Sequence, residues 1–393
     1  MKARKLSDRI DAVGAVDWDR RLFDGLIPLP DGTSYNAYLV RGSEKTALID
    51  AADPSKRDIL FENLGGVERI DFIVSNHSEQ DHSGLLGEVL AHYPMAKVIC
   101  SAKAKGMLVD HLHLSESVIE VVADGATVSL GDRTLEFIST PWVHWPETMS
   151  TYLREEKVLF SGDFFGSHLA QSDVFVTDAD RAYEPAKRYF AEIMLPFRTT
   201  IRKNLERLAG FDIAVIAPSH GPVWKRPEFI LEAYRDWSSE EVKNGVVVPY
   251  VSMHGSTELM VRRLVDALAG HGITACLLNM DEADIGKLAV DLVDAATVVF
   301  GTSAVHIGPH PKIAFAAFLA NALRPKTRFA SIVGSFGWGQ KIVEQLTGLV
   351  PNLKVELLPP VICRGKPRPS DLEAVEALAA AIAEKHRGLG LLG

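Results

Sequence analysis

Four side chains that can bind metal ions lie close together in residues 71–84. His77, Glu79, Asp81 and His82 fall within six residues, directly after a short apolar strand. Alternate side chains of an extended segment share a face, so we expect His77, Glu79 and Asp81 to converge, with His82 beside them. Two imidazoles and two carboxylates suit one or two divalent or trivalent metal ions. Taken alone, the segment also fits a polar loop with scattered charges.

Three further potential ligands follow apolar strands in the first 240 residues. His144, Asp163 and His220 each come at the end of such a strand. Functional side chains gather at strand ends because a rigid sheet holds the loops there. A single histidine in this position is usually solvated or caps a neighbouring element. Four strand ends that all offer ligands predict a binuclear metal site.

The elements that position these ligands are short strands with helices between them. Residues 36–40 and 46–50 are apolar and flank a polar turn, which predicts a β-hairpin. Residues 84–93 have a helical pattern. The first part of the chain is therefore predicted to mix strands and helices.

Length and composition set limits on the class of protein. The 393 residues are 47% hydrophobic and 24% charged, which predicts a soluble globular protein with two domains. The formal net charge of −9 argues against a nucleic-acid partner. The charged N-terminus and the lack of long apolar runs argue against a signal peptide and a membrane partner. Three scattered cysteines, Cys100, Cys276 and Cys363, fit a reducing cytoplasmic location.

A polar segment at residues 237–245 ends in Asn-Gly and predicts a boundary between domains 1–245 and 246–393. Beyond it, apolar strands alternate with helices, which predicts a doubly wound parallel sheet. The expected strands are 246–251, 274–278, 297–300, 329–333 and 354–358.

Three loops at strand ends of this second domain could hold a ligand, because such sheets bind ligands beyond the carboxyl ends of their strands. The first loop opens into a helix and offers hydroxyls, a glycine and a helix N-terminus, which suit a phosphate. An ordinary N-capped helix is the alternative. The third loop adds flat aromatic rings. The candidate residues are Ser252, Met253, His254, Gly255, Ser256, Thr257, Ala304, Val305, His306, Gly308, Ser335, Phe336, Gly337 and Trp338.

The ligand pattern resembles the metallo-β-lactamase superfamily, and within it the flavodiiron proteins. Zinc hydrolases of the superfamily usually carry a histidine where this chain has Glu79; the extra negative charge and hard oxygen favour iron. Segments 31–40 and 144–149 are also similar to flavodiiron motifs. The three loops of the second half resemble those with which flavodoxin binds FMN, although Ala304 and His306 stand where relatives commonly have Thr and Asn.

The resemblance implies a metallo-β-lactamase-like αββα sandwich in residues 1–245 and a flavodoxin-like, FMN-binding domain in residues 246–393. Two irons would be bound in the first domain. Some relatives leave the histidine equivalent to His82 uncoordinated. By the resemblance, one iron takes His77, Glu79 and His144, the other takes Asp81, His82 and His220, and Asp163 bridges both.

The implied activity is reduction of O2 to water, NO to N2O, or both, with electrons passed through FMN. A separate donor, rubredoxin or a reduced deazaflavin, would supply the electrons. Protomers would pair head to tail in a homodimer or tetramer, so that the FMN of one chain faces the irons of another. The alternative function is a metallo-β-lactamase-type zinc hydrolase with an accessory flavodoxin domain, and Glu79 argues against it.

Overall fold

The computed structural model describes residues 2–392, and their contacts divide the chain into two units. Unit 1 is Met1–Ser238 and unit 2 is Ser239–Gly393. The division falls a few residues before the predicted boundary at residue 245. Strand β17 (Lys243–Val251) begins with the polar residues Lys243 and Asn244, so its start is not visible in the apolar pattern.

Two sheets form the centre of unit 1 within the described residues. The first has the order β1 (Arg4–Lys5), β2 (Ile10–Ala12), β7 (Tyr38–Arg41), β8 (Thr46–Ile49), β9 (Phe72–Val74), β10 (Lys97–Ser101) and β11 (Ile119–Val122). The second has the order β12 (Thr127–Ser129), β13 (Thr134–Ser139), β14 (Met149–Leu153), β15 (Val158–Gly162) and β16 (Val215–Pro218). Short pairs are β3 (Ala15–Asp17) with β6 (Thr33–Tyr35), and β4 (Leu22–Phe23) with β5 (Ile27–Pro28). The predicted hairpin at residues 36–50 is confirmed as β7 and β8, which pair antiparallel.

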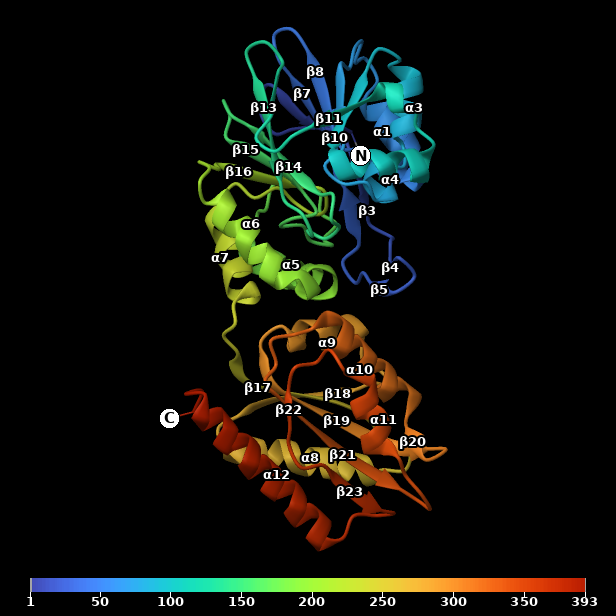
Figure 1. Cartoon of the computed structure of the whole chain (residues 1–393), viewed down its shortest axis with the longest axis vertical. Helices are drawn as coiled ribbons and strands as arrows, with labels where there is room; N and C mark the ends of the chain where they lie inside the picture. The colour runs from blue at the N-terminus through green and yellow to red at the C-terminus, as the bar shows by residue number, and fades with distance from the viewer. Residues whose placement is uncertain (1, 393) are drawn as a thin grey trace. The chain divides into compact units, whose positions relative to one another are not determined.

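The two sheets pack face to face around an apolar core. Successive side chains of a strand point to opposite faces, and on β7 Val40 joins the core between the sheets whereas Leu39 joins the core under the helices. Across the sandwich, the rings of Tyr38 and Phe160 lie 5.2 Å apart. Helices α1 (Arg57–Asn63), α3 (Leu86–His92) and α4 (Ala102–Leu112) lie on the outer side of the first sheet (Figure 1).

The other helices of unit 1 follow the strand ends of the second sheet or precede unit 2. Helices α5, α6 and α7 lie together beside the second sheet (Figure 1). This arrangement confirms the predicted metallo-β-lactamase-like sandwich. The bounds are α2 Gln80–Ser83, α5 Ala179–Tyr189, α6 Arg198–Leu208 and α7 Pro227–Ser238, with short 3-10 turns at Pro54–Lys56, Glu116–Val118 and Leu195–Phe197 and a π-helical turn at Phe190–Met194.

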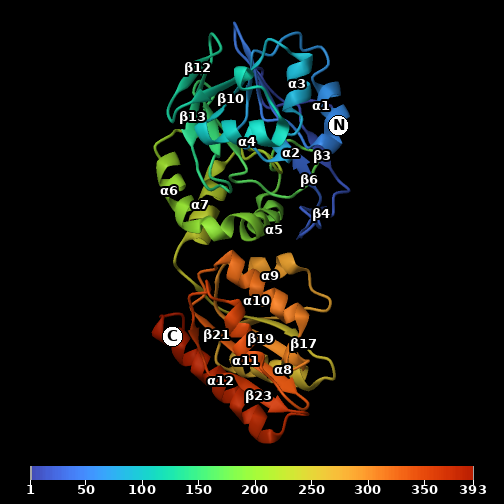
Figure 2. The same cartoon turned by 45° about the vertical axis from the view of Figure 1, so that its right-hand side comes forward.

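Unit 2 is a parallel sheet with helices on both faces, which confirms the doubly wound fold. Helices α8 and α12 pack on one face, and α9, α10 and α11 pack on the other (Figure 2). The strand order is β18 (Thr274–Asn279), β17, β19 (Ala295–Val305), β21 (Phe329–Phe336) and β22 (Glu356–Leu357); β23 (Val361–Arg364) also pairs with β21, and β20 (Gly308–Pro309) is antiparallel to β19. The helices are α8 Ser256–Gly270, α9 Ile285–Leu292, α10 Pro311–Leu323, α11 Ile342–Leu349 and α12 Pro369–Gly388.

Two details of unit 2 differ from the prediction. The strand expected at residues 354–358 is only the two-residue β22, because the chain then turns and a second edge strand, β23, pairs further along β21. Strands β19 and β21 also run further than expected, so four candidate residues lie in strands rather than loops: Ala304, Val305, Ser335 and Phe336. Between residues 2 and 392, none of the helices has the length and apolarity that a membrane span requires.

Candidate metal centre and strand-end loops

The structure brings all seven predicted metal ligands together in unit 1. They form two groups, each with side-chain nitrogen and oxygen atoms within 4.8 Å of one another: His77, Glu79, His144 and Asp163 in one, and Asp81, His82 and His220 in the other. In the first group the Nε2 atoms of His77 and His144 each lie 3.0 Å from Oε2 of Glu79. In the second group Nε2 of His220 lies 3.1 Å from Oδ2 of Asp81.

Asp163 lies between the two groups. Its Oδ2 atom is 3.6 Å from Nε2 of His77 and 3.4 Å from Nε2 of His144. Its Oδ1 atom is 3.0 Å from Nε2 of His82 and 3.5 Å from Nε2 of His220. One carboxylate therefore offers one oxygen to each group, which is the arrangement expected of a ligand that bridges two metal ions.

The expected convergence of His77, Glu79 and Asp81 on one extended face is wrong. The chain is extended only as far as Glu79, and the helical turn α2 begins at Gln80. This turn directs Asp81 and His82 to the second group while His77 and Glu79 remain in the first. A helical turn separates side chains that an extended segment would place together.

The donor atoms fit bound metal ions. Both carboxylate oxygens of Asp81 and Oδ1 of Asp163 are buried without a hydrogen-bond partner among the described residues. A buried carboxylate without a partner is strongly unfavourable, and coordination to a cation satisfies it. Each group offers three or four nitrogen and oxygen donors and no thiolate. Such donors suit non-haem iron as well as other first-row metals.

The first group is the more open side of the centre. The side chains of His144 and Glu79 are 18% and 14% exposed, whereas those of His77, Asp163 and His82 are at most 2% exposed. A small molecule therefore reaches the centre most directly beside His144 and Glu79.

Hydrogen bonds from outside the two groups set the orientation of two imidazoles. Nδ1 of His77 lies 2.7 Å from Oε1 of Glu147, which also accepts a hydrogen bond from Ser78 N at 3.0 Å. Nδ1 of His220 lies 2.7 Å from the carbonyl oxygen of Ser34, so this nitrogen carries the proton and donates it. In both rings Nε2 is thereby directed to the centre, which is how ligand histidines are usually held.

Neighbouring charges shift the pKa values of the centre. Burial would raise the pKa of Glu79, but hydrogen bonds from His144 and His77 hold it well below its usual range. Burial would lower the pKa of His82, but the charges of Asp81 and Asp163 raise it to about 9. The low pKa of Glu79 favours its ionised form, which attracts cations, and a metal ion would compete with the proton for the imidazole of His82.

Sequence reasoning missed Glu147 and Ser34. Glu147 was visible in the segment 144–149, but nothing in the sequence shows that it contacts His77, 70 positions away. Ser34 lies 186 positions from His220. His168, also absent from the predicted ligands, is buried against His220, with ring centroids 5.1 Å apart.

The three strand-end loops of unit 2 also come together. Oγ1 of Thr257, at the start of α8, lies 2.9 Å from Oγ of Ser335 on β21. The same atom lies 3.1 Å from Oγ of Ser303 on β19, and Met253 N donates to that hydroxyl at 3.3 Å. Ser303 is a further residue that the sequence prediction did not include.

These loops fit a phosphate and a flat ring. Helix α8 begins after Gly255, which has a φ of +80° and makes no side-chain cap. Glu258 N donates to Ser252 Oγ at 3.1 Å, and the N–H groups of Ser256 and Thr257 ahead of it are those that suit an anion. A Cβ atom at Gly255 or Gly337 would meet nothing within 4 Å, so the space over both is open. Trp338 is 77% exposed and could cover a bound ring. His306 lies at the tip of the β19–β20 hairpin, and Gly308 is buried in β20.

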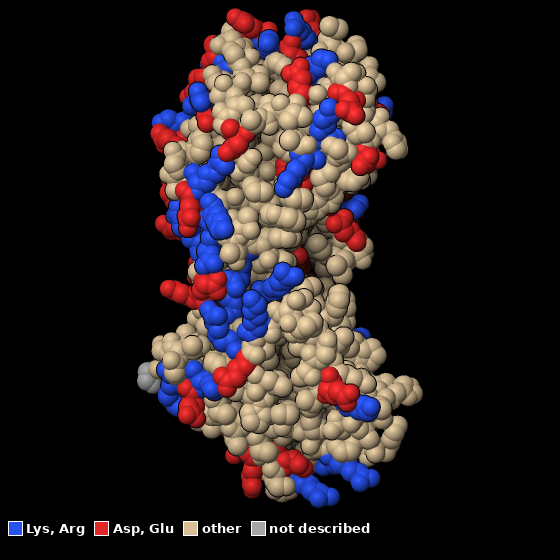
Figure 3. Space-filling view, viewed as in Figure 1, with Lys and Arg blue, Asp and Glu red and all other residues tan. Residues whose placement is uncertain are grey.

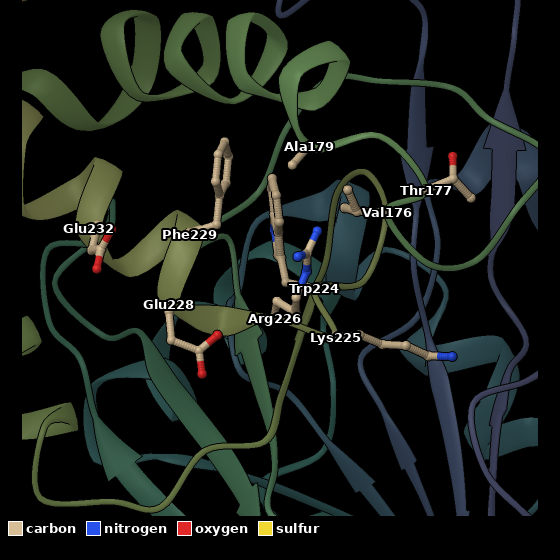
Figure 4. Close-up of a pocket in the computed structure, with 9 residues that line it drawn as sticks. All are labelled: Val176, Thr177, Ala179, Trp224, Lys225, Arg226, Glu228, Phe229 and Glu232. Carbon is tan, nitrogen blue, oxygen red and sulfur yellow. The ribbon is translucent and has the colours of Figure 1, made fainter.

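Unit 1 contains a separate cavity of about 380 Å3 at the start of α7 (Figure 4). The rings of Trp224 and Phe229 are stacked in its wall, with centroids 5.9 Å apart. The seven candidate ligands do not line it. Its wall still supports the centre, because the indole N–H of Trp224 donates to the carbonyl oxygen of Phe165 at 3.1 Å, two residues after Asp163.

The fold and the site define a β-lactamase-like metalloprotein joined to a flavodoxin-like domain, and comparison with known proteins agrees. The family model described as ODP family beta lactamase matches residues 33–221. A nitric oxide reductase of Moorella thermoacetica is 34% identical over 97% of this chain and 98% of its own length.

Two solved structures are similar over nearly the whole chain. The rubredoxin oxygen:oxidoreductase of Desulfovibrio gigas has a TM-score of 0.95 and 30% identity, covering 98% of this chain and 99% of that one. The flavodiiron protein of Giardia intestinalis has a TM-score of 0.91 and 27% identity, covering 98% of both chains. The chain belongs to the flavodiiron proteins, and it is an oxidoreductase of that family.

Proposed function

We propose that this protein reduces O2 to water, NO to N2O, or both, at two irons held by the metal centre of unit 1. The observation that carries the proposal is the position of Asp163 between two groups of ligands, one of which contains Glu79. Two adjacent metal positions suit a diatomic substrate. The carboxylate of Glu79 favours iron, which can change its oxidation state, over zinc, which cannot.

We propose that FMN binds at residues 252–257, 304–308 and 335–338 of unit 2, which we call the flavin loops. The start of α8 would hold the phosphate, and Phe336 and Trp338 would offer rings on which the flat ring system could stack. When bound, FMN and the two irons together supply four electrons, the number that converts O2 and four protons to two waters. Reduction of two NO molecules to N2O and water takes only two electrons.

The protein's own residues have clear roles in this scheme. Glu147 and the carbonyl of Ser34 hold the rings of His77 and His220 with Nε2 toward the metal positions. Asp163 is the expected bridge and offsets the repulsion between two cations. Access beside His144 and Glu79 admits a diatomic molecule.

Several further assignments belong to the same proposal. We infer domains at residues 1–245 and 246–393, and a cytoplasmic location. Rubredoxin or a reduced deazaflavin is the expected electron donor. Protomers are expected to pair head to tail, as a dimer or a tetramer, so that FMN of one chain serves the irons of its partner.

Metal analysis and anaerobic kinetics test the function together. Purified protein is expected to contain two irons and one FMN per chain. The chemically reduced protein is then mixed with limiting O2 or NO, and flavin reoxidation is followed by absorbance. Fast reoxidation by either gas supports the proposal, and the faster gas identifies the preferred substrate. Two zinc ions per chain and no fast reoxidation would instead favour the hydrolase alternative.

A further inference from the structure

The cavity at the start of α7 lies outside the metal centre and has the size of a small-molecule site. Its volume is about 380 Å3, within the roughly 300–1,000 Å3 that ligand pockets span. Its walls come from two segments, residues 176–179 at the start of α5 and residues 224–232 at the start of α7. Small-molecule sites combine an apolar wall with a few polar groups that orient the ligand. The lining of this cavity provides both.

Two aromatic rings form the apolar wall of the cavity. The rings of Trp224 and Phe229 are stacked, with centroids 5.9 Å apart and planes inclined by 22°. Trp224 is buried, and its indole N–H donates to Phe165 O, so its ring is fixed in place. Phe229 is half-buried. A fixed pair of rings offers an apolar surface on which a further ring can pack.

The cavity also contains charged side chains of both signs. Arg226 directly precedes α7, and Glu228 and Glu232 lie one turn apart on that helix. In Figure 4 the guanidinium of Arg226 lies beside the ring of Trp224, whereas the two carboxylates lie on the side of Phe229. Opposite charges therefore flank the ring pair.

These charges are not neutralised within the chain. Among the described residues, no carboxylate oxygen lies within 4.0 Å of the Arg226 guanidinium, and no Lys or Arg nitrogen lies that close to the carboxylates of Glu228 and Glu232. Lys225 differs, because its Nζ atom lies 3.7 Å from the centroid of the Phe175 ring. The first N–H groups of α7 have no partner within the helix and add partial positive charge beside Arg226. The cavity can therefore attract a carboxylate at one side and an ammonium group at the other.

The balance of charge distinguishes the cavity from the surface near it. Figure 3 shows Lys and Arg side chains gathered along the side of unit 1 that α6 and α7 form. Helix α6 carries Arg198, Arg202, Lys203 and Arg207. The cavity lining instead contains two cations and two carboxylates. A simple anion would meet the two glutamates and a simple cation would meet Arg226, so a molecule with both charges fits best.

We propose that this cavity binds a small aromatic zwitterion, such as a free aromatic amino acid. Its ring would contact Trp224 and Phe229, its carboxylate would approach Arg226, and its ammonium group would approach Glu228 and Glu232. Charge-assisted hydrogen bonds of this kind are stronger than neutral ones and orient a ligand. The site goes beyond the proposed function and depends neither on the metal centre nor on FMN.

Three probes with the same ring and different charges test the site. L-phenylalanine carries both charges, 3-phenylpropionate lacks the ammonium group, and 2-phenylethylamine lacks the carboxylate. Each probe is titrated by calorimetry into the full-length protein as purified. L-phenylalanine is expected to bind with a Kd below about 1 mM, and about tenfold more tightly than either of the other probes. Failure of L-phenylalanine to bind, or equal or tighter binding of a singly charged probe, would overturn the proposal.

The R226Q variant tests the carboxylate end of the site. It is expected to bind L-phenylalanine and 3-phenylpropionate about tenfold more weakly and 2-phenylethylamine without change, because only the first two carry a carboxylate. The matched control is R235Q, an exposed position in the last turn of α7 that does not line the cavity. The control is expected to bind all three probes like the unmodified protein. Equal losses in R226Q and R235Q would contradict the role of Arg226.

The E228Q/E232Q variant tests the ammonium end and should show the opposite selectivity. It is expected to bind L-phenylalanine and 2-phenylethylamine about tenfold more weakly and 3-phenylpropionate without change. The matched control is E184Q/E206Q, at two exposed positions of α5 and α6 outside the lining. Damage to the fold would weaken all three probes alike, so opposite selectivities in the two test variants identify the site. A common loss of all three probes in either variant, or no loss, would overturn the proposal.

Discussion

Asp163 offers one carboxylate oxygen to each group of metal ligands, at 3.4–3.6 Å from His77 and His144 through Oδ2 and at 3.0–3.5 Å from His82 and His220 through Oδ1. This single side chain joins two sets of donors that come from different strand ends. For binding of the metal ions, the negative charge of Asp163 is therefore expected to matter more than the shape of its side chain.

Substitution of Asp163 by Asn is expected to remove most of the iron and to leave FMN bound. An amide of the same shape cannot offset the repulsion between two cations. Iron content and flavin absorbance of the purified variant are measured together. Two irons per chain with normal activity would show that Asp163 does not bridge the metals.

Glu147→Gln tests whether the contact of Glu147 with His77 increases the affinity of the centre for metal ions. The amide oxygen can still accept from His77 and Ser78, but the negative charge is lost. Metal affinity is expected to fall about 10- to 100-fold, as is usual for the loss of such a partner. Metal competition with a chelator measures the change. Glu228→Gln, an exposed substitution on α7, is the control and should leave metal affinity unchanged.

At the scale of secondary-structure elements, parallel strands bring the three flavin loops to one edge of a sheet. Thr257 begins α8, and its hydroxyl contacts serines on both β19 and β21. This shared hydroxyl ties the three strand ends together although they are far apart in sequence.

Thr257→Val is expected to loosen the flavin loops without changing the fold. Valine has nearly the same shape as threonine, but the buried hydroxyls of Ser303 and Ser335 lose their hydrogen-bond partner. The free energy of unfolding is expected to fall by about 1–2 kcal/mol. FMN affinity, measured by fluorescence quenching, is expected to fall about tenfold. Ser331→Ala is a suitable control, because this buried hydroxyl of β21 bonds to Pro359 O. Equal FMN affinity in the two variants would contradict the proposal that FMN binds at the flavin loops.

At the scale of the whole molecule, the chain consists of two units with separate cores. The two faces of the unit 2 sheet are covered by its own helices, and its buried side chains come from residues after 245. The metal ligands are all in unit 1. We therefore expect unit 2 to bind flavin without unit 1, and reduction of the substrate to require unit 1.

A fragment of residues 239–393 is expected to fold alone, bind FMN and accept electrons, without reducing O2 to water or NO to N2O at the full-length rate. A fragment of residues 246–393 should be less stable by about 2–4 kcal/mol, because it lacks the start of β17 and several of its hydrogen bonds. Among these, Lys243 N donates to Asp294 O at 2.7 Å and Asn244 Oδ1 bonds to His386. Chemical unfolding compares the fragments, and full-rate O2 reduction by the longer one would refute the division of roles.

The sequence by itself determined the types of the seven metal ligands, their places at strand ends, the two-domain order and the strand–helix rhythm of unit 2. These features depend on side-chain chemistry and on local periodicity, which neighbouring residues encode. The carboxylate of Glu79, which favours iron, is likewise visible without a structure.

Only the tertiary structure decided which ligands share a metal position. The helical turn α2 moves Asp81 and His82 away from Glu79, and the packing of two sheets brings Glu147 to His77. It also decided that β23 continues the sheet beside β21. Each of these depends on contacts between distant segments. Such contacts arise from the burial of whole strands and helices against one another, and no local pattern records which distant residue a side chain will meet.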